Sequence, residues 1–201
     1  MANQIAPFGL SPVGTITGAP YNEQGRLYAL QNDSVNTYAI GDVVQFATGS
    51  DTNGVTYVTK YNPATGIPVG VIVGIRVADP SVSLQGIDLH LSQNYLPLNS
   101  GPRYVYVVDD PNVIFAVQCD STAITSTNLH QNATLTVTAN QTTLSPSSPQ
   151  SNTVATGFSV SATDPLLVLG TVQIPGNLIG AYALLLVKWN KHQFFGGQAG
   201  A

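Results

Sequence analysis

The side chains that could carry out acid–base chemistry are few in this sequence. The chain has ten acidic residues and three histidines among 201 residues. A general acid–base pair needs two titratable groups close together, with pKa values that their surroundings adjust. Asp109 and Asp110 are neighbours, but they lie in a DDPN turn with no histidine or lysine near them in sequence. We therefore expect turn carboxylates here rather than a catalytic pair or a calcium site.

The remaining acidic residues also give little sign of catalysis. Most aspartates precede proline, serine or threonine, as aspartates do when they accept hydrogen bonds from their own turn. Glu23 is the only glutamate. Asp42 and Asp88 lie in strand-like segments, so they are the two carboxylates that a glycoside hydrolase on a β-sandwich could use. A glycoside hydrolase is the least favoured of the three functional classes considered for this sequence, after the two binding or structural classes described below. We predict no catalytic residues.

Metal and nucleophile chemistry have no recognisable motif either. His90, His130 and His192 are 40 and 62 residues apart, which matches no metal-ligand spacing. Cys119 is the single cysteine, and its strand-like surroundings predict a small buried core residue. No nucleophile elbow, P-loop or dinucleotide fingerprint occurs. We expect no metal and no cofactor, and a protein that is not an enzyme.

The low charge of the chain indicates which partners to expect. Charged residues make up 8% of the sequence, against about 25% in an average soluble protein. The net charge is −4 and the six basic residues are scattered, so nucleic acid is not an expected ligand. The longest apolar stretch, residues 178–187, is shorter than the ~20 residues that cross a bilayer. Uncharged surface is less costly to bury than charged surface, which favours a structural or interaction role.

Short β-branched runs between turn residues predict an all-β fold, specifically a β-sandwich or jelly-roll-like domain of about eight to ten strands. Hairpin turns are expected at residues 51–54 (DTNG), 110–112 (DPN) and 174–177 (IPGN). The clearest hairpin is residues 103–119, whose consecutive apolar residues indicate that both faces are covered. Further strands are expected at residues 38–46, 55–60, 66–77, 87–91, 135–137, 166–173 and 178–189, with a marginal one around Phe158.

The first 22 residues carry no charged side chain and are punctuated by proline and glycine. They lack the basic region and unbroken apolar run of a signal peptide. We predict an extended N-terminal arm (residues 1–28), a β domain (29–192) and a loose C-terminal tail (193–201) pinned by Phe194 or Phe195. Residues 2–22 are expected to order only against another chain. The predicted partner-binding residues are Phe8, Leu10, Tyr21 and Tyr28.

Four stretches together resemble the cement or decoration proteins of tailed-bacteriophage capsids. They are residues 3–30 (NQIAPFGLSPVGTITGAPYNEQGRLYAL), 40–46 (IGDVVQF), 103–120 (RYVYVVDDPNVIFAVQCD) and 169–194 (LGTVQIPGNLIGAYALLLVKWNKHQF). The resemblance implies a β-rich virion protein, a dimer or trimer made in the host cytoplasm, that binds the major capsid protein on the outer surface of the capsid between capsomers. It supplies no catalytic residues.

A competing hypothesis is a phage tail or fibre β module that binds a receptor or carbohydrate. Such modules share the threonine-, asparagine- and glycine-rich composition of this chain. They usually show short repeats or an intertwined shaft, and the sequence shows neither. Binding to cells or polysaccharide, rather than to phage heads, would favour this alternative.

Overall fold

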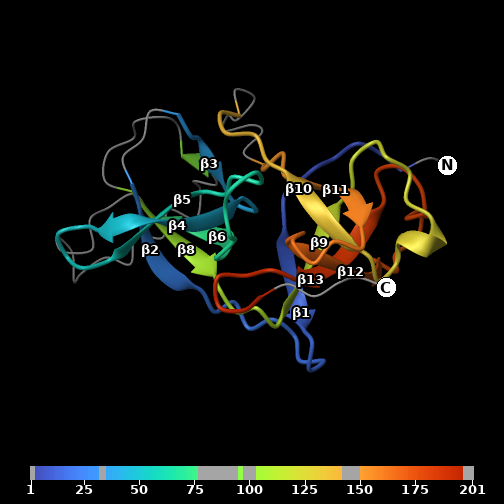
Figure 1. Ribbon diagram of the computed structural model, residues 1–201, viewed down its shortest axis with the longest axis horizontal. Coiled ribbons are helices and arrows are strands. Elements are labelled where there is room, and N and C mark those ends of the chain that lie inside the picture. Colours follow the sequence, from blue (N-terminus) through green and yellow to red (C-terminus); the bar gives the residue numbers. More distant parts are fainter. Residues whose placement is uncertain (1–2, 32–34, 77–94, 97–102, 142–149, 197–201) are drawn as a thin grey trace.

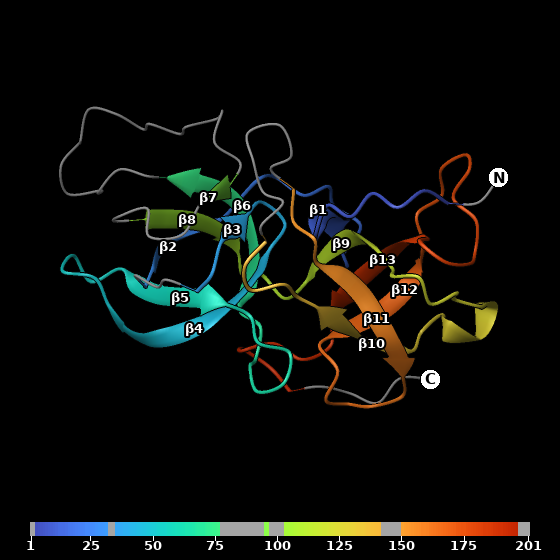
Figure 2. The ribbon, with the colours of Figure 1, turned by 90° about the horizontal axis from the view of Figure 1, so that it is seen from above.

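The computed structural model describes residues 3–31, 35–76, 95–96, 103–141 and 150–196. The all-β prediction is confirmed: strands form a six-stranded sheet and a closed five-stranded barrel that lie side by side (Figures 1 and 2). In spatial order the sheet contains β1 (Ser11–Thr15), β9 (Val113–Gln118), β13 (Leu184–Trp189), β12 (Leu166–Thr171), β10 (Asn132–Thr136) and β11 (Val154–Ser159). The barrel contains β2 (Arg26–Leu30), β5 (Thr56–Lys60), β4 (Val43–Ser50), β6 (Gly70–Arg76) and β8 (Arg103–Val108). A short pair, β3 (Tyr38–Ala39) with β7 (Tyr95–Leu96), and one 3₁₀ turn, η1 (Ser126–Asn128), complete the described elements.

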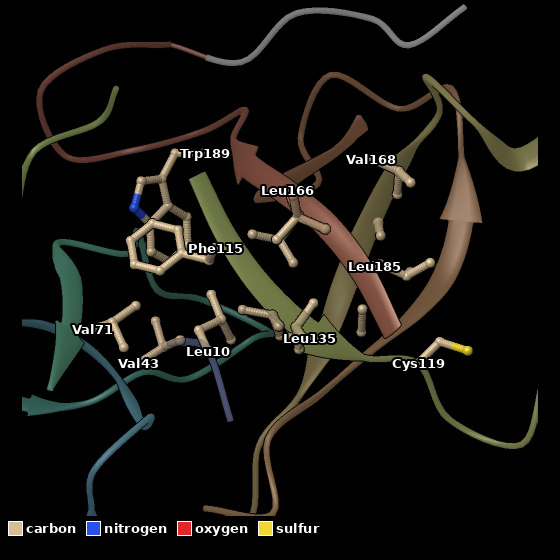
Figure 3. Close-up of a cluster of buried hydrophobic side chains, with 14 of the residues drawn as sticks. Leu10, Val43, Val71, Phe115, Cys119, Leu135, Leu166, Val168, Leu185 and Trp189 are labelled. Carbon is tan, nitrogen blue, oxygen red and sulfur yellow. The ribbon is translucent and has the colours of Figure 1, made fainter. Parts of the chain in front are cut away.

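Consecutive apolar residues in the barrel strands serve two different cores. Val44 and Val107 belong to a cluster inside the barrel, whereas their neighbours Val43 and Val108 join a second cluster that includes the sheet. Side chains alternate between the two faces of a strand, so an unbroken apolar run covers both faces. Figure 3 shows Val43 beside Leu10 in the second cluster. The barrel wall and the sheet therefore pack against each other as two layers.

Two of the predicted hairpins are confirmed. β4 and β5 pair antiparallel around the DTNG turn, where Val55 N–H donates to Asp51 Oδ1 at 2.7 Å and Gly54 has a φ of +79°. β12 and β13 pair antiparallel with Leu166 opposite Trp189. The strands expected at residues 66–77 and 135–137 and around Phe158 correspond to β6, β10 and β11. The strand expected at residues 87–91 lies outside the described residues, as do Asp88 and His90.

The hairpin predicted for residues 103–119 is wrong. β8 pairs with β2 and β6 in the barrel, whereas β9 pairs with β1 and β13 in the sheet. The turn itself forms as expected, since Asn112 N–H donates to Asp110 Oδ1 at 2.9 Å. It carries the chain out of the barrel and into the sheet. The prediction that both faces of these strands are covered holds, because most residues of β8 and β9 are buried.

The N-terminal segment is extended, as predicted, but it lies on its own chain. β1 pairs with β9, with Ser11 opposite Ala116, and Leu10 is 1% exposed. Leu10 N–H donates to Gly41 O at 2.9 Å. Gly9 and Gly41 have φ values of +76° and +92°. A Cβ on Gly9 would collide with the carbonyl group of Gly41, and a Cβ on Gly41 would collide with the carbonyl oxygen of Phe8. The expectation that this segment orders only against another chain is therefore corrected.

The start of the predicted C-terminal tail is pinned to the barrel. His192 Nε2–H donates to Val69 O, and Gln193 N–H donates to Pro68 O at 2.9 Å. The rings of Phe194 and Phe46 lie 6.5 Å apart, so Phe194 holds the segment as predicted. These contacts join the chain that follows β13 to the barrel.

Candidate interaction surface

The loop between β12 and β13, residues 172–183, displays large apolar side chains to solvent. Ile174, Leu178 and Ile179 are 49%, 55% and 51% exposed. The apolar run at residues 178–183 predicts a strand, but β13 begins only at Leu184. Ile5, at 68% exposed, is in the N-terminal segment that runs beside this loop (Figure 2). We call Ile5 together with residues 172–183 the apolar loop.

Side-chain amides hold the apolar loop in one conformation. Asn177 Nδ2–H donates to Leu184 O, and Leu184 N–H donates back to Asn177 Oδ1, both at 2.9 Å. Asn3 spans the loop in the same way: its Nδ2–H donates to the carbonyls of Leu178 and Ala181 at 2.8 Å, and its Oδ1 accepts from Leu178 N–H at 3.1 Å. Because this backbone is already ordered, a partner that binds it loses little conformational entropy.

The buried amide of Gln118 ties the N-terminal segment to the apolar loop. Its Oε1 accepts from Ala6 N–H at 2.9 Å, and its Nε2–H donates to Gln4 O at 2.8 Å and to Tyr182 O at 3.1 Å. Gln118 is the last residue of β9. The loop and the segment therefore share one anchor on the sheet.

A second apolar display is the hairpin that follows β1, residues 15–20, which projects at the lower edge of Figure 1. Thr15 N–H donates to Ala19 O, and Gly18 N–H donates to Thr15 O, both at 2.9 Å. Ile16 at its tip is 51% exposed. Val13, in β1, is exposed to a similar degree. We call residues 13–20, which include Val13 and this hairpin, the apolar hairpin.

The apolar loop and the apolar hairpin lie at opposite ends of β9. Thr15 pairs with Val113 at the start of β9, and Leu184 pairs with Gln118 at its end. A strand rises about 3.4 Å per residue, so these two ends are roughly 17 Å apart. One rigid sheet therefore carries two separated apolar contacts.

Two of the four predicted partner-binding residues are buried and cannot contact a partner. Leu10 lies in the core, and Tyr28 is 4% exposed, with its hydroxyl donating to Asp109 Oδ2 at 2.7 Å. Burial, with help from Asp109, raises the pKa of Tyr28 to about 12. Phe8 and Tyr21 remain partly exposed and line a groove between the sheet and the barrel. The assignments of Leu10 and Tyr28 as partner-binding residues are therefore corrected.

Asp42, a carboxylate considered for catalysis, is fully buried in a polar cluster. Lys60 Nζ lies 3.0 Å from its Oδ2, and Ala39 N–H donates to the same oxygen at 2.8 Å. Gln141 Nε2–H and Ser151 Oγ–H donate to Oδ1. With no exposed surface, this carboxylate can join the start of β4 to Gln141 and Ser151, but it cannot meet a substrate.

The other residues with possible chemistry are also structural in their placement. Burial disfavours the charged form of a side chain. It therefore raises the pKa of the Cys119 thiol and lowers the pKa of His192. His130 has a φ of +66°, and its backbone N–H donates to Val168 O. Among the residues that the structure describes, no group of three histidine, cysteine or acidic side chains is placed to hold a metal ion.

Comparison with known proteins gives no relative: no family model, no curated protein and no solved structure matches this chain. Within the described part of the chain, no helix is long and apolar enough to span a membrane.

Proposed function

We propose that this protein is a structural virion protein of a tailed phage, which binds the outer surface of the capsid between capsomers and stabilises the head. The observation that supports this proposal is the pair of apolar contacts at opposite ends of β9, on one rigid sheet. A protein that bridges capsomers must hold two neighbouring subunits of the major capsid protein at once. Two separated contacts on a stiff support meet that requirement.

The energetics of two linked contacts suit this role. Full burial of one large aliphatic side chain contributes about 1.5–3 kcal/mol, so burying the exposed half of one contributes about 1 kcal/mol. Neither contact alone would hold the protein on a head. Linking them makes the second binding event intramolecular, which raises avidity by about 10² to 10⁴. Association into a dimer or trimer, which we also propose, would multiply the contacts further.

Head binding tests the proposal directly. Expanded heads that lack the protein are mixed with purified protein, and occupancy is measured by electron cryomicroscopy and cosedimentation. Leu178→Ser with Ile179→Ser removes half-exposed apolar surface worth about 2 kcal/mol, so we expect about 30-fold weaker binding. Val13→Ser with Ile16→Ser should weaken binding similarly. Val160→Ser is the matched control, since Val160 is 57% exposed but lies next to β11 at the far edge of the sheet.

Two results would overturn the proposal. One is that heads mixed with a saturating concentration of the protein show no additional density. The other is equal occupancy by the wild type and by a variant that carries all four serine substitutions. Binding of the wild type to host cells or surface polysaccharide, without binding to heads, would instead support the receptor-binding alternative.

A further inference from the structure

A groove of about 1410 Å³ lies between the edge of the sheet formed by β1 and the barrel. One wall comes from β1 and the chain between β1 and β2, and the other from β6 and β8 of the barrel. Its volume exceeds the roughly 300–1,000 Å³ typical of sites for small ligands. The size therefore suits a segment of polymer better than a single small molecule.

Three aromatic side chains contribute to the lining: Phe8, Tyr21 and Tyr106, each partly exposed. The Tyr21 hydroxyl donates to Gln24 O at 2.7 Å, which fixes the direction of its ring. Tyrosine is neutral at physiological pH, and partial burial and the nearby Glu23 carboxylate raise the pKa of Tyr21 further, to about 12. Neutral, oriented aromatic faces can bind both apolar groups and cations.

The charges along the groove are unequal. Among the residues that the structure describes, the lining contains the carboxylates of Glu23, Asp109 and Asp110 and one cationic group, Arg26, which together give a formal charge of −2. Arg26 Nη1 lies 3.1 Å from Asp109 Oδ2, and the Tyr28 hydroxyl also donates to that oxygen. Asp109 is therefore balanced within the chain. Glu23 and Asp110 are exposed and supply the uncompensated negative charge.

We propose that this groove binds an extended peptide segment of a partner protein that presents arginine or lysine side chains. The cationic heads would pair with Glu23 and Asp110, while the apolar stems and any aromatic residues of the peptide would pack on the rings of Tyr21 and Tyr106. Charge complementarity selects this ligand over a neutral carbohydrate, which would gain nothing from a charge of −2. Under the proposed function the peptide belongs to the major capsid protein, and in that respect the inference rests on that proposal.

Fluorescence anisotropy with synthetic peptides tests the groove without requiring heads. The probe is a fluorescein-labelled nonapeptide of alternating threonine and arginine (TRTRTRTRT), and TETETETET is its reversed-charge counterpart. We expect Glu23→Gln with Asp110→Asn to weaken binding of the arginine peptide by about threefold to thirtyfold, at about 0.3–1 kcal/mol for each exposed carboxylate. The matched control is Asp51→Asn with Asp120→Asn, which removes two negative charges away from the groove and should change binding less than twofold.

Several results would overturn the inference. They are similar binding of the two peptides, equal weakening by the groove variant and the control variant, and displacement of the arginine peptide by maltopentaose, which would mark a carbohydrate site. Head binding is scored separately. If the wild type fails to bind heads but the groove variant loses the arginine peptide, the proposed function fails and the groove inference stands.

Discussion

Replacing Lys60 with methionine should destabilise the protein strongly, because Lys60 is one half of a buried ion pair. Its side chain is 2% exposed, and its ammonium group lies 3.0 Å from Asp42 Oδ2 and donates to Thr37 O at 2.8 Å. Methionine keeps the length and apolar stem of lysine but removes the charge. The carboxylate of Asp42 would then remain buried without a countercharge.

The expected magnitude follows from what Asp42 keeps. Removing one partner of a buried ion pair typically costs 3–5 kcal/mol, because the remaining charge is uncompensated. Asp42 would still accept hydrogen bonds from Ala39 N–H, Gln141 and Ser151, so we expect the lower end, about 3 kcal/mol. Asp42→Asn strands the ammonium group instead, and we expect a loss nearer 5 kcal/mol.

The assay is urea unfolding followed by the fluorescence of Trp189, which is the only tryptophan and is fully buried. The double variant Asp42→Asn with Lys60→Met buries no charge, so its loss should be at least about 2 kcal/mol smaller than the two single losses added together. A loss below about 1 kcal/mol for Lys60→Met, or strictly additive losses, would refute the reasoning.

Three further predictions test the fold and the contact between its two parts. Leu10→Ala should cost about 2–5 kcal/mol, because it leaves a cavity in the core; a detached arm would lose almost nothing. Gly9→Ala should cost about 2–3 kcal/mol through its positive φ and the collision with Gly41, whereas Gly18→Ala, with a similar φ but open space, should cost about 1 kcal/mol; equal urea midpoints would contradict this. Burial lowers the pKa of His192 below 6.5, so its neutral form stabilises the fold above pH 6.5, and this contribution is lost as the pH falls through the lowered value. The melting temperature should therefore drop more between pH 7.5 and 5 for the wild type than for His192→Gln, and parallel curves would exclude this role.

Sequence reasoning succeeds here where neighbours along the chain determine the structure. The DTNG turn fixes the pairing of β4 with β5 because its residues tolerate positive φ and Asp51 binds the backbone of the turn. The DPN turn at residues 110–112 has equally good turn chemistry, yet no hairpin follows. A turn sets only a change of direction, and the partners of β8 and β9 come from distant parts of the chain. Those pairings cannot be predicted from local residues.

The contact surfaces were harder to predict for a related reason. The uncharged N-terminal segment is indeed favourable to bury, but the surface that covers Leu10 belongs to the same chain. The apolar run at residues 178–183 resembles a strand, and only the amides of Asn3 and Asn177 show why it is a loop. Asn3 and Leu178 are 175 residues apart in sequence, and no local pattern connects them.

The placement of β1 next to β9 has a consequence for synthesis. Thr15 and Val113 are paired in the sheet, yet the ribosome releases the second nearly a hundred residues after the first. At about 5–20 residues per second, β1 waits roughly 5–20 s for its partner. Every barrel strand emerges in that interval, so the barrel can close first. Vectorial synthesis would then make the finished barrel the template on which the later strands assemble the sheet.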